Sequence, residues 1–391
     1  MNTFTAAPQA LGYLYQARYS LYLALQKPDD HQISIEKFDD IAFEQNGTAT
    51  ELLQLKHHVT AKSLTDSSPD LWKTIRVWST AITQKAMQPS AMTLLIVTTA
   101  NAPDDSVASL LRLGAERNEF MALEKLRQIA ASSQNQALVS AYDAFQQLSQ
   151  SEQQELVAAV AIIDCASDIT DVKRDIERRL RFAVRPQYLS AMYERLEGWW
   201  FGQVIDHLAG RSETPIPCSF VGSKIDDLRE QFRADALPID TFDINEADSS
   251  MDGRQFVSQL LEIRVGPGRI NKAILDHDKA FAQRSKWLRE ELLVAGEIDT
   301  YEARLVDEWE REILARQDRD DRWQSTDEGD LQGFGQDVFY WVDRVADIKI
   351  RPRVSEAYIM RGSYHMLADH EPPHVWWHPQ YIQRRSRSNE S

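Results

Sequence analysis

The dipeptide Asn46-Gly47 constrains the fold of this chain more than any other short feature. It stands between two runs rich in Ile, Phe and Leu, Gln32–Glu44 and Thr48–His57. Asn and Gly both accept the positive φ angles of the tight turns that match the twist of paired strands. We therefore predict a β-hairpin near the N-terminus, with these two runs as its antiparallel strands.

The segments around the hairpin predict an α/β arrangement. Leu and Tyr residues at helical spacing indicate an amphipathic helix over Ala6–Gln26. After the hairpin, the turn residues Ser63–Asp70 lead into a helical pattern that starts at Leu71. The apolar run Thr93–Thr99 is typical of a strand buried on both faces. The expected order is helix, hairpin, helix and strand.

Helical patterns dominate the rest of the chain. Residues 104–154 are helical and rich in Gln, Ala and Ser, and Leu156–Asp164 reads as a further strand. The acidic, turn-rich segment Ala234–Gly253 predicts a domain boundary. Beyond it, Arg254–Arg316 carries densely charged helical patterns with Trp residues available for a buried stripe.

Charge and composition narrow the class of protein. The 391 residues carry a net charge of −16, but residues 1–100 hold eight Lys and Arg against nine Asp and Glu, which leaves −15 for the remainder. Acidity argues against general nucleic-acid binding by that remainder, and not by the first hundred residues. Cys165 and Cys218 are too few for a disulfide framework or a four-cysteine zinc site. With neither a signal peptide nor a membrane-length apolar run in view, we expect a cytoplasmic protein.

The hairpin holds the main candidate site. Gln54 and Lys56 are two residues apart on one strand, so they project from the same face. The preceding strand-like run, Gln32–Glu44, contributes two adjacent carboxylates, Asp39 and Asp40. A two-residue loop would set Asp39 opposite Gln54, whereas a three-residue loop that starts at Gln45 and includes a bulge would set Asp40 there. Both registers are open at this point.

These residue types suit metal-assisted hydrolysis. A carboxylate and an amide oxygen can hold Mg²⁺, and a neighbouring ammonium can position the attacking water or stabilise developing charge. The alternative is a solvated hairpin face, because short motifs often match by chance. His57, His58, Glu36 and Glu51 lie near the site in sequence, and we rank all four behind the first set.

Two other groups of residues are weaker candidates for a functional site. His365, His370, His374 and His378 do not follow the spacing of a closed tetrahedral zinc site, so we favour packing and hydrogen bonding over metal binding. The Trp pairs at 199–200 and 376–377 are more typical of core or interface anchors than of base-stacking platforms. A P-loop motif is missing from the sequence.

Longer stretches carry a family resemblance. The segments FDDIAFE, LQLKHH and LTDSSPDLWKTIRVW resemble the PD-(D/E)xK nuclease superfamily, in the branch with Q-x-K in place of (D/E)-x-K. Together with INKAILDHDKAFAQRSKWLREELL and the ending MRGSYHMLAD…WHP, they resemble the nuclease-bearing component of ABC-three-component anti-phage defence systems.

The resemblance implies a fold and a set of site residues. It implies an α/β restriction-endonuclease-like domain over residues 1–170, a helical connector over 171–250 and a mainly α-helical assembly domain over 251–391. Asp40 or Asp39 matches the metal-binding aspartate, Gln54 the second ligand position and Lys56 the catalytic lysine. Gln16 falls where many members carry a glutamate that assists the metal. The amides at Gln16 and Gln54 depart from that pattern and weaken the metal site.

The resemblance also implies partners and an activity. It predicts a Mg²⁺- or Mn²⁺-dependent endonuclease that cleaves double-stranded DNA as the effector of a defence system. The expected partners are an ABC/SMC-like ATPase and a small middle component, with a homodimer as a further expectation and no membrane association. Two alternatives remain: a weak or inactive nuclease-fold adaptor that binds DNA or the ATPase, and a purely structural interaction protein.

Overall fold

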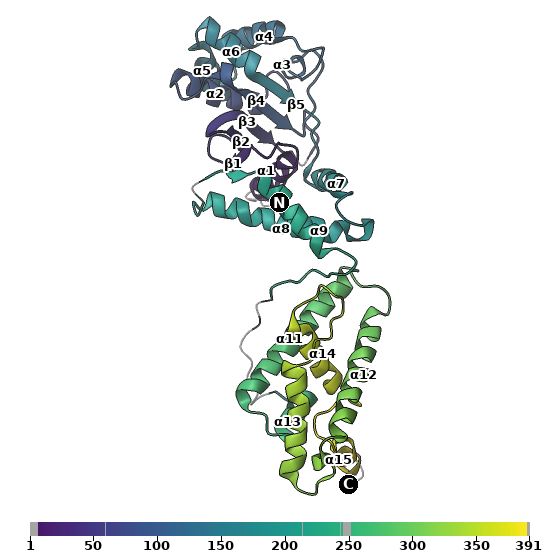
Figure 1. The fold of residues 1–391 in the computed structure, drawn as a ribbon. Helices are drawn as coiled ribbons and strands as arrows, with labels where there is room; N and C mark the ends of the chain where they lie inside the picture. Colours follow the sequence, from purple (N-terminus) through teal and green to yellow (C-terminus); the bar gives the residue numbers. More distant parts are fainter. Residues whose placement is uncertain (1–6, 59, 213, 243, 245–251, 389–391) are drawn as a thin grey trace, which may run out of the picture. The chain divides into compact units, whose positions relative to one another are not determined.

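The computed structural model describes residues 7–58, 60–212, 214–242, 244 and 252–388. The chain forms two compact units, one of residues 1–185 with 189–228 and one of residues 186–188 with 229–391. All strands assigned in the described residues lie in the first unit, and the second is helical (Figure 1). The predicted combination of an α/β N-terminal part with a mainly helical C-terminal part is confirmed.

A six-stranded mixed sheet in the order β5-β4-β3-β2-β1-β6 organises the first unit. β1, β2 and β3 form an antiparallel meander, β3, β4 and β5 run parallel, and β6 pairs antiparallel with β1. The strands are β1 Gln32–Ile35, β2 Ile41–Gln45, β3 Thr48–Lys56, β4 Thr93–Thr98, β5 Val160–Ile163 and β6 Ile216–Pro217.

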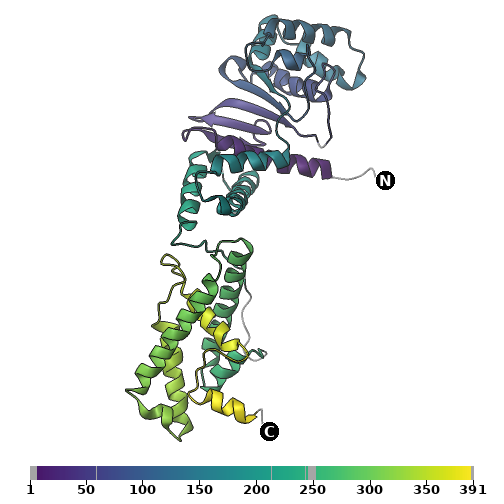
Figure 2. The same ribbon diagram turned by 90° about the vertical axis from the view of Figure 1, so that its right-hand side faces the viewer.

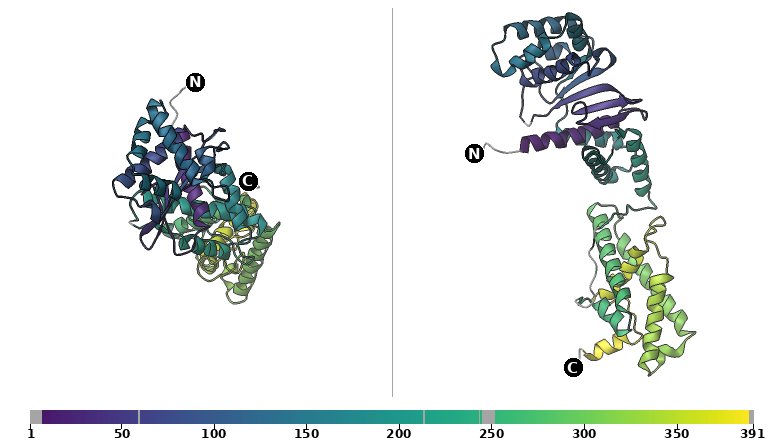
Figure 3. Two further views of the ribbon diagram at one scale, coloured as in Figure 1. Left: turned by 90° about the horizontal axis from the view of Figure 1, so that it is seen from above. Right: turned by 90° about the vertical axis from the view of Figure 1, so that its left-hand side faces the viewer.

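Helices cover both faces of this sheet (Figure 1). On one face, the helices that follow β3 share a buried cluster with Leu52 and Ile96 of the sheet. α1 and α8 lie on the other face, as the side views also show (Figures 2 and 3). The helices are α1 Ala7–Ala24, α2 Pro69–Thr83, α3 Val107–Leu110, α4 Glu119–Ser132, α5 Val139–Gln146, α6 Gln150–Ala159, α7 Ile169–Leu180, α8 Leu189–Leu208 and α9 Ser219–Gln231.

Local signals explain the start of α2. Ser68 is the N-cap, its hydroxyl accepts a hydrogen bond from the backbone N–H of Asp70, and Pro69 occupies the first turn. The buried side chains include Trp72 and Trp78, which lie on the face toward the sheet. α2 therefore begins where the turn residues end, as predicted, and it brings Trp78 toward the hairpin.

The strand predicted over Leu156–Asp164 begins later than expected. α6 continues to Ala159, and only Val160–Ile163 forms β5. The capping box of Ser149 and Glu152 starts the helix, and Leu156 lies on its buried side. The end of the helix and the start of the strand share one apolar run, and no Gly, Pro or polar residue within it signals where the helix ends.

The hairpin contains both features that the sequence left as alternatives. Asn46 and Gly47 have φ angles of 52° and 78°, and Gln45 pairs with Thr48 across a two-residue loop. The register then shifts by one between Phe43 and Glu44, which leaves Thr50 as the extra residue of a β-bulge. Beyond the bulge, the pairing continues to the end of β2 in the shifted register.

The single strand predicted over Gln32–Glu44 is wrong, because two strands occupy that run. β1 ends at Ile35, Glu36 takes a φ of 58°, and β2 starts only at Ile41. The backbone N–H of Glu36 donates to the carbonyl of Asp40 at 3.2 Å and closes the turn. In this turn Glu36 and Lys37 are exposed, and Asp39 and Asp40 are half-buried.

Helices α10 to α15 lie in the described part of the second unit, and α11 and α14 make the most extensive pairing between them. They cross closely: a Cβ atom at Gly362 would lie 2.2 Å from the carbonyl oxygen of Asp276 and 2.5 Å from the Cβ of Ala280. The helices are α10 Gln255–Glu262, α11 Pro267–Arg289, α12 Glu297–Gln317, α13 Glu328–Arg344, α14 Ala357–Asp369 and α15 Tyr381–Ser388. Short 3₁₀ helices occur at Pro89–Ala91, Gln136–Leu138, Pro186–Tyr188 and Asp321–Gln324.

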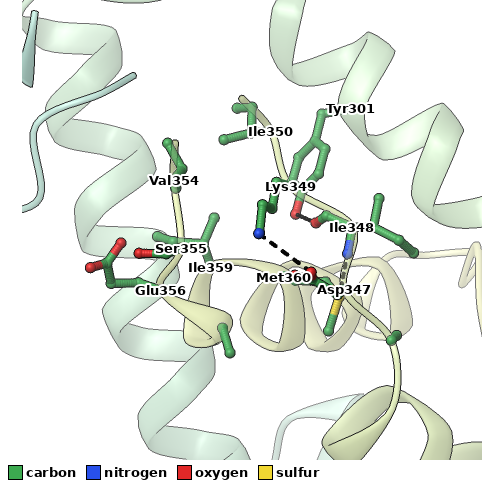
Figure 4. A pocket seen from close by; sticks show the side chains of 12 residues that line it. Tyr301, Asp347, Ile348, Lys349, Ile350, Val354, Ser355, Glu356, Ile359 and Met360 are labelled. Atoms are coloured by element: carbon green, nitrogen blue, oxygen red, sulfur yellow. Dashed lines mark hydrogen bonds and ion pairs between the residues drawn. The ribbon is translucent and has the colours of Figure 1, made fainter. Parts of the chain in front are cut away.

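The segment between α13 and α14 is tied to its neighbours around a cavity of about 20 Å³ (Figure 4). The Tyr301 hydroxyl donates to the carbonyl of Ile348 at 2.9 Å, and the backbone N–H of Ile348 donates to the Met360 sulfur at 3.3 Å. Lys349 pairs with Asp347 at 3.3 Å. These contacts fix the connection without leaving room for a ligand larger than water.

The two units meet along the chain at Leu228 and Arg229, within α9. Of the boundary predicted over Ala234–Gly253, residues 243 and 245–251 lie outside the described residues. None of the helices in the described ranges has the length and apolar composition needed to cross a bilayer.

Candidate functional site

Asp40 stands beside β3 at the end of the β1–β2 turn. The last pair of the β2–β3 ladder is Ile41 with Leu53, so the next position sets Asp40 level with Gln54. The Asp40 carboxylate accepts a hydrogen bond of 2.6 Å from the backbone N–H of Leu55. Of the two aspartates that the sequence left open, Asp40 is therefore the one that the strand register sets level with Gln54.

Asp39 has a different role in the structure. Its carboxylate accepts hydrogen bonds from the indole N–H of Trp78 at 3.0 Å and from the backbone N–H of Asp40 at 3.1 Å. Burial, and then the charge of Asp40, raise the pKa of Asp39 to about 6, although Trp78 and Lys56 act in the opposite direction. Asp39 thus anchors the turn to α2, and it lies close enough to Asp40 and Lys56 for their charges to change its pKa.

Glu36 joins this group from the first position of the same turn. Its positive φ turns the chain back so that its backbone meets Asp40. Burial and the charge of Asp40 raise the pKa of the Glu36 carboxyl, whereas a side-chain hydrogen bond from Gln16 and the charge of Lys56 lower it. The sequence places Glu36 behind the other candidates, and the turn that separates β1 from β2 brings it into this group.

Gln54 and Lys56 occupy alternate positions on β3, next to the parallel strand β4. Gln54 pairs with Ile96 and Lys56 with Thr98, and both side chains are half-buried. Strand alternation places them on the face that carries Leu52, which packs in the cluster beneath α2. Lys56 is the cation whose charge reaches both Glu36 and Asp39.

Gln16 enters from α1 and completes the set. It is the one candidate that lies far from the hairpin in sequence, and its side chain hydrogen-bonds the Glu36 carboxylate. The structure therefore groups four predicted residues, Gln16, Asp39, Asp40 and Lys56, with Glu36, and it sets Gln54 level with Asp40.

The neighbouring polar residues are engaged elsewhere. The His57 ring packs on Tyr15 with centroids 4.6 Å apart, and burial lowers its pKa. His58 pairs through Nε2 with Asp70 at 3.0 Å. Glu51 forms an ion pair with Lys27. Their ranking behind the first set agrees with these structural partners.

The donors suit a hard divalent cation with an incomplete protein shell. Two carboxylates, those of Glu36 and Asp40, lie close enough for one to raise the pKa of the other, and Gln54 adds an amide oxygen. Within the described residues, no group of three or more His, Cys, Asp or Glu side chains is arranged to hold a metal ion. Magnesium tolerates this, because it keeps several waters and takes ligands from a substrate phosphate.

The C-terminal histidines behave mainly as packing residues. His365 is buried against Phe256 with ring centroids 5.1 Å apart, and burial lowers its pKa to about 3. His378 is also buried, and its Nδ1 accepts a hydrogen bond from the backbone N–H of Gln380 at 3.1 Å. His370 and His374 stack on each other at 4.6 Å. This arrangement agrees with the preference for packing over metal binding.

Comparison with protein families gives one match. Residues 256–385, which are 130 of the 391 residues, match the family described as C-terminal domain 7 of the ABC-three component (ABC-3C) systems. A comparison with curated proteins found no match. The matched segment lies in the second unit and supports membership of the chain in an ABC-three-component system, as the C-terminal motifs predicted.

Proposed function

We propose that this chain is the effector of an ABC-three-component anti-phage defence system and that its first unit hydrolyses double-stranded DNA with Mg²⁺ or Mn²⁺. The observation that carries the proposal is the meeting of Glu36 and Asp40 with the Lys56 ammonium at one end of the inner strands β2 and β3. Paired carboxylates next to a lysine are a donor set for metal-assisted phosphodiester hydrolysis. The arrangement of α1, the β1–β3 meander, α2 and β4 supports the restriction-endonuclease-like fold that the sequence resemblance implies.

Each residue has a task in this proposal. Asp40, Gln54 and Glu36 would hold the ion, and a bound ion would supply polarisation of the phosphoryl oxygen and a lower pKa of bound water. The Leu55 N–H fixes the orientation of the Asp40 carboxylate, and Gln16 orients Glu36. Lys56 positions the attacking water and stabilises the negative charge that develops on the phosphate.

Charge distribution supports a role for partners in DNA binding. The first hundred residues have a net charge of −1, whereas the rest of the chain has −15. Contacts with DNA phosphates come mainly from Lys and Arg. Basic surfaces of the ATPase, of the small middle component or of a second copy of this chain would then complete the DNA-binding surface.

A plasmid-cleavage assay with the full chain and its co-expressed partner components tests the activity. Lys56→Ala and Asp40→Asn should each reduce Mg²⁺-dependent cleavage at least 100-fold, and a chelator should abolish it. Lys272→Ala is the matched control, because Lys272 is an exposed lysine of the second unit. Equal cleavage by the wild type and Lys56→Ala would overturn the assignment.

A second candidate function is a nuclease-fold adaptor without catalysis. It is favoured by the neutral amides at Gln16 and Gln54 and by the backbone N–H that already occupies one oxygen of Asp40. This candidate predicts phage protection that survives both Lys56→Ala and Asp40→Asn. The endonuclease proposal predicts that protection and cleavage are lost together.

A further inference from the structure

α12 has two faces with different environments. Tyr301, Leu305 and Trp309 are buried at intervals of four residues and pack into the second unit. A second series, which we call the α12 stripe, recurs at alternating intervals of four and three and consists of Asp299, Ala303, Val306, Glu310, Ile313 and Gln317. All six side chains are exposed or half-exposed. The stripe runs for about 27 Å along the helix.

The α12 stripe lines two adjoining hollows on the surface of the second unit. One hollow, of about 600 Å³, is bounded by the stripe from Asp299 to Glu310 and by His374. The other, of about 280 Å³, is bounded by the stripe from Glu310 to Gln317 and by Trp376. Glu310 lines both hollows, which lie between α12 and the segment that follows α14, and we call the two together the groove.

The groove is apolar at one end and acidic along the other. Leu314, beside the stripe, has 61 % of its surface exposed, and Trp376 packs edge-on against Trp309 with ring centroids 4.8 Å apart. Four carboxylates line the acidic end: Glu302 pairs with Arg284 and Asp307 with Arg311. The other two, Asp299 and Glu310, have no ion-pair partner within the described part of the chain. The occupant must therefore offer apolar side chains to one end and positive charge to the other.

The carboxylates of the groove indicate which kind of protein can bind there. A second copy of the chain carries the same two carboxylates on this face and the same net charge of −16. Two copies that faced each other through their grooves would bury these carboxylates against one another, which is costly. A basic partner gains attraction from the same carboxylates.

We propose that the groove along the α12 stripe binds an amphipathic helix of a partner protein. The stripe forms one face of α12, so a partner helix that lies along α12 can contact the stripe over its full length. The partner helix carries Leu, Ile or Met on its inner face and Lys or Arg opposite Asp299 and Glu310. The inference concerns the second unit alone and is independent of the proposed endonuclease activity.

Fluorescence anisotropy with designed peptides tests the chemistry of this groove in the full chain. The probe is a labelled helical peptide of about 20 residues with Leu in alternating four-three spacing and Lys at the flanking positions. A second peptide has Glu in place of every Lys. We expect the Lys peptide to bind at least ten times more tightly than the Glu peptide, and more weakly as salt increases.

Variants of the groove decide whether the peptide binds there. Leu314→Asp and Glu310→Lys should each weaken binding of the Lys peptide at least tenfold. Their matched controls are Tyr340→Asp, on the exposed surface of α13, and Asp318→Lys, just beyond α12, and both should leave the affinity unchanged. Thermal unfolding followed by circular dichroism identifies any variant that fails to fold.

Two results would overturn the proposal. One is equal binding of the Lys peptide by the wild type and by a correctly folded Leu314→Asp. The other is a dimer of the full chain, seen by sedimentation, that Leu314→Asp dissociates, because this would assign the groove to a second copy.

Discussion

The carboxylate of Asp40 accepts a 2.6 Å hydrogen bond from the backbone N–H of Leu55. Asp40 itself lies one position past Ile41, which forms the last pair of the β2–β3 ladder with Leu53. A side chain thereby takes the place of a strand backbone and holds the turn against β3. The bond gives Asp40 a structural role beside its proposed role as a metal ligand.

Two substitutions of Asp40 should separate these roles. Asp40→Ala leaves the Leu55 N–H without its acceptor and should cost about 1–3 kcal/mol in the free energy of unfolding. Asp40→Asn keeps an acceptor oxygen and should cost less, yet it removes the charge that a metal needs. Urea unfolding and Mg²⁺-dependent cleavage measure the two effects. Equal stability of the Ala variant and the wild type would show that the hydrogen bond contributes little.

The buried carboxyl of Asp39 should make stability depend on pH. Its pKa is raised from 3.8 to about 6 in the folded state, so the folded chain holds this proton more tightly than the unfolded chain does. The contribution of Asp39 to stability is therefore largest below pH 4 and is lost as pH rises through 6. Asp39→Asn should raise the free energy of unfolding relative to the wild type by about 1–3 kcal/mol at pH 8 and by almost nothing at pH 4.

Chemical unfolding at a series of pH values in chelator-containing buffer measures this difference. Asp318→Asn is the control, since it makes the same chemical change at an exposed aspartate of the second unit. A constant difference between Asp39→Asn and the wild type across the range would contradict the prediction.

The close crossing of α11 and α14 should tolerate no side chain at Gly362. An added Cβ would meet the carbonyl oxygen of Asp276 and the Cβ of Ala280 at less than van der Waals separation. Gly362→Ala should therefore destabilise the chain by about 1–3 kcal/mol. Gly268→Ala, in the first turn of α11 with open space around its Cβ position, should be neutral or slightly stabilising. Thermal unfolding of the two variants gives the comparison.

Arg351 should contribute far more to stability than its neighbour Arg353. Its guanidinium donates to both oxygens of Glu297 at 2.7 Å and to two backbone carbonyls, and it is 6 % exposed. Arg351→Met leaves the partly buried Glu297 unpaired and should cost about 3–5 kcal/mol. Arg353→Met breaks an ion pair with Glu230 in which both side chains are about half exposed, and should cost at most about 1 kcal/mol. Similar costs for the two variants in urea unfolding would contradict this ranking.

The sequence predicted most strongly those features whose signals are local. The Asn46-Gly47 turn, the start of α2 after Ser68 and the buried run of β4 each depend on a few adjacent residues with strong backbone or burial preferences. The shared face of Lys56 and Gln54 followed from strand alternation alone. These predictions needed no knowledge of the tertiary structure.

Other features depend on contacts that no short segment records. The choice of Asp40 over Asp39 followed from a bulge in β3 and from the burial of Trp78, which draws Asp39 toward α2. The position of Glu36 followed from a reversal inside an apparently continuous strand. In each case a single residue with an unusual backbone angle or an extra position changed which side chains meet.

The bulge at Thr50 has a consequence for how this protein can vary. Thr50 lies outside the pairing, while Glu44 pairs with Ala49 before it and Phe43 pairs with Glu51 after it. Removal of Thr50 would leave both pairs in place and close the ladder into an ordinary two-residue hairpin. The tip of the hairpin can therefore lose a residue without changing which residues face each other at Asp40 and Gln54. Homologues whose hairpins differ by one residue at this point are expected to keep the same site, so the spacing between the aspartate and the lysine motif is free to vary by one.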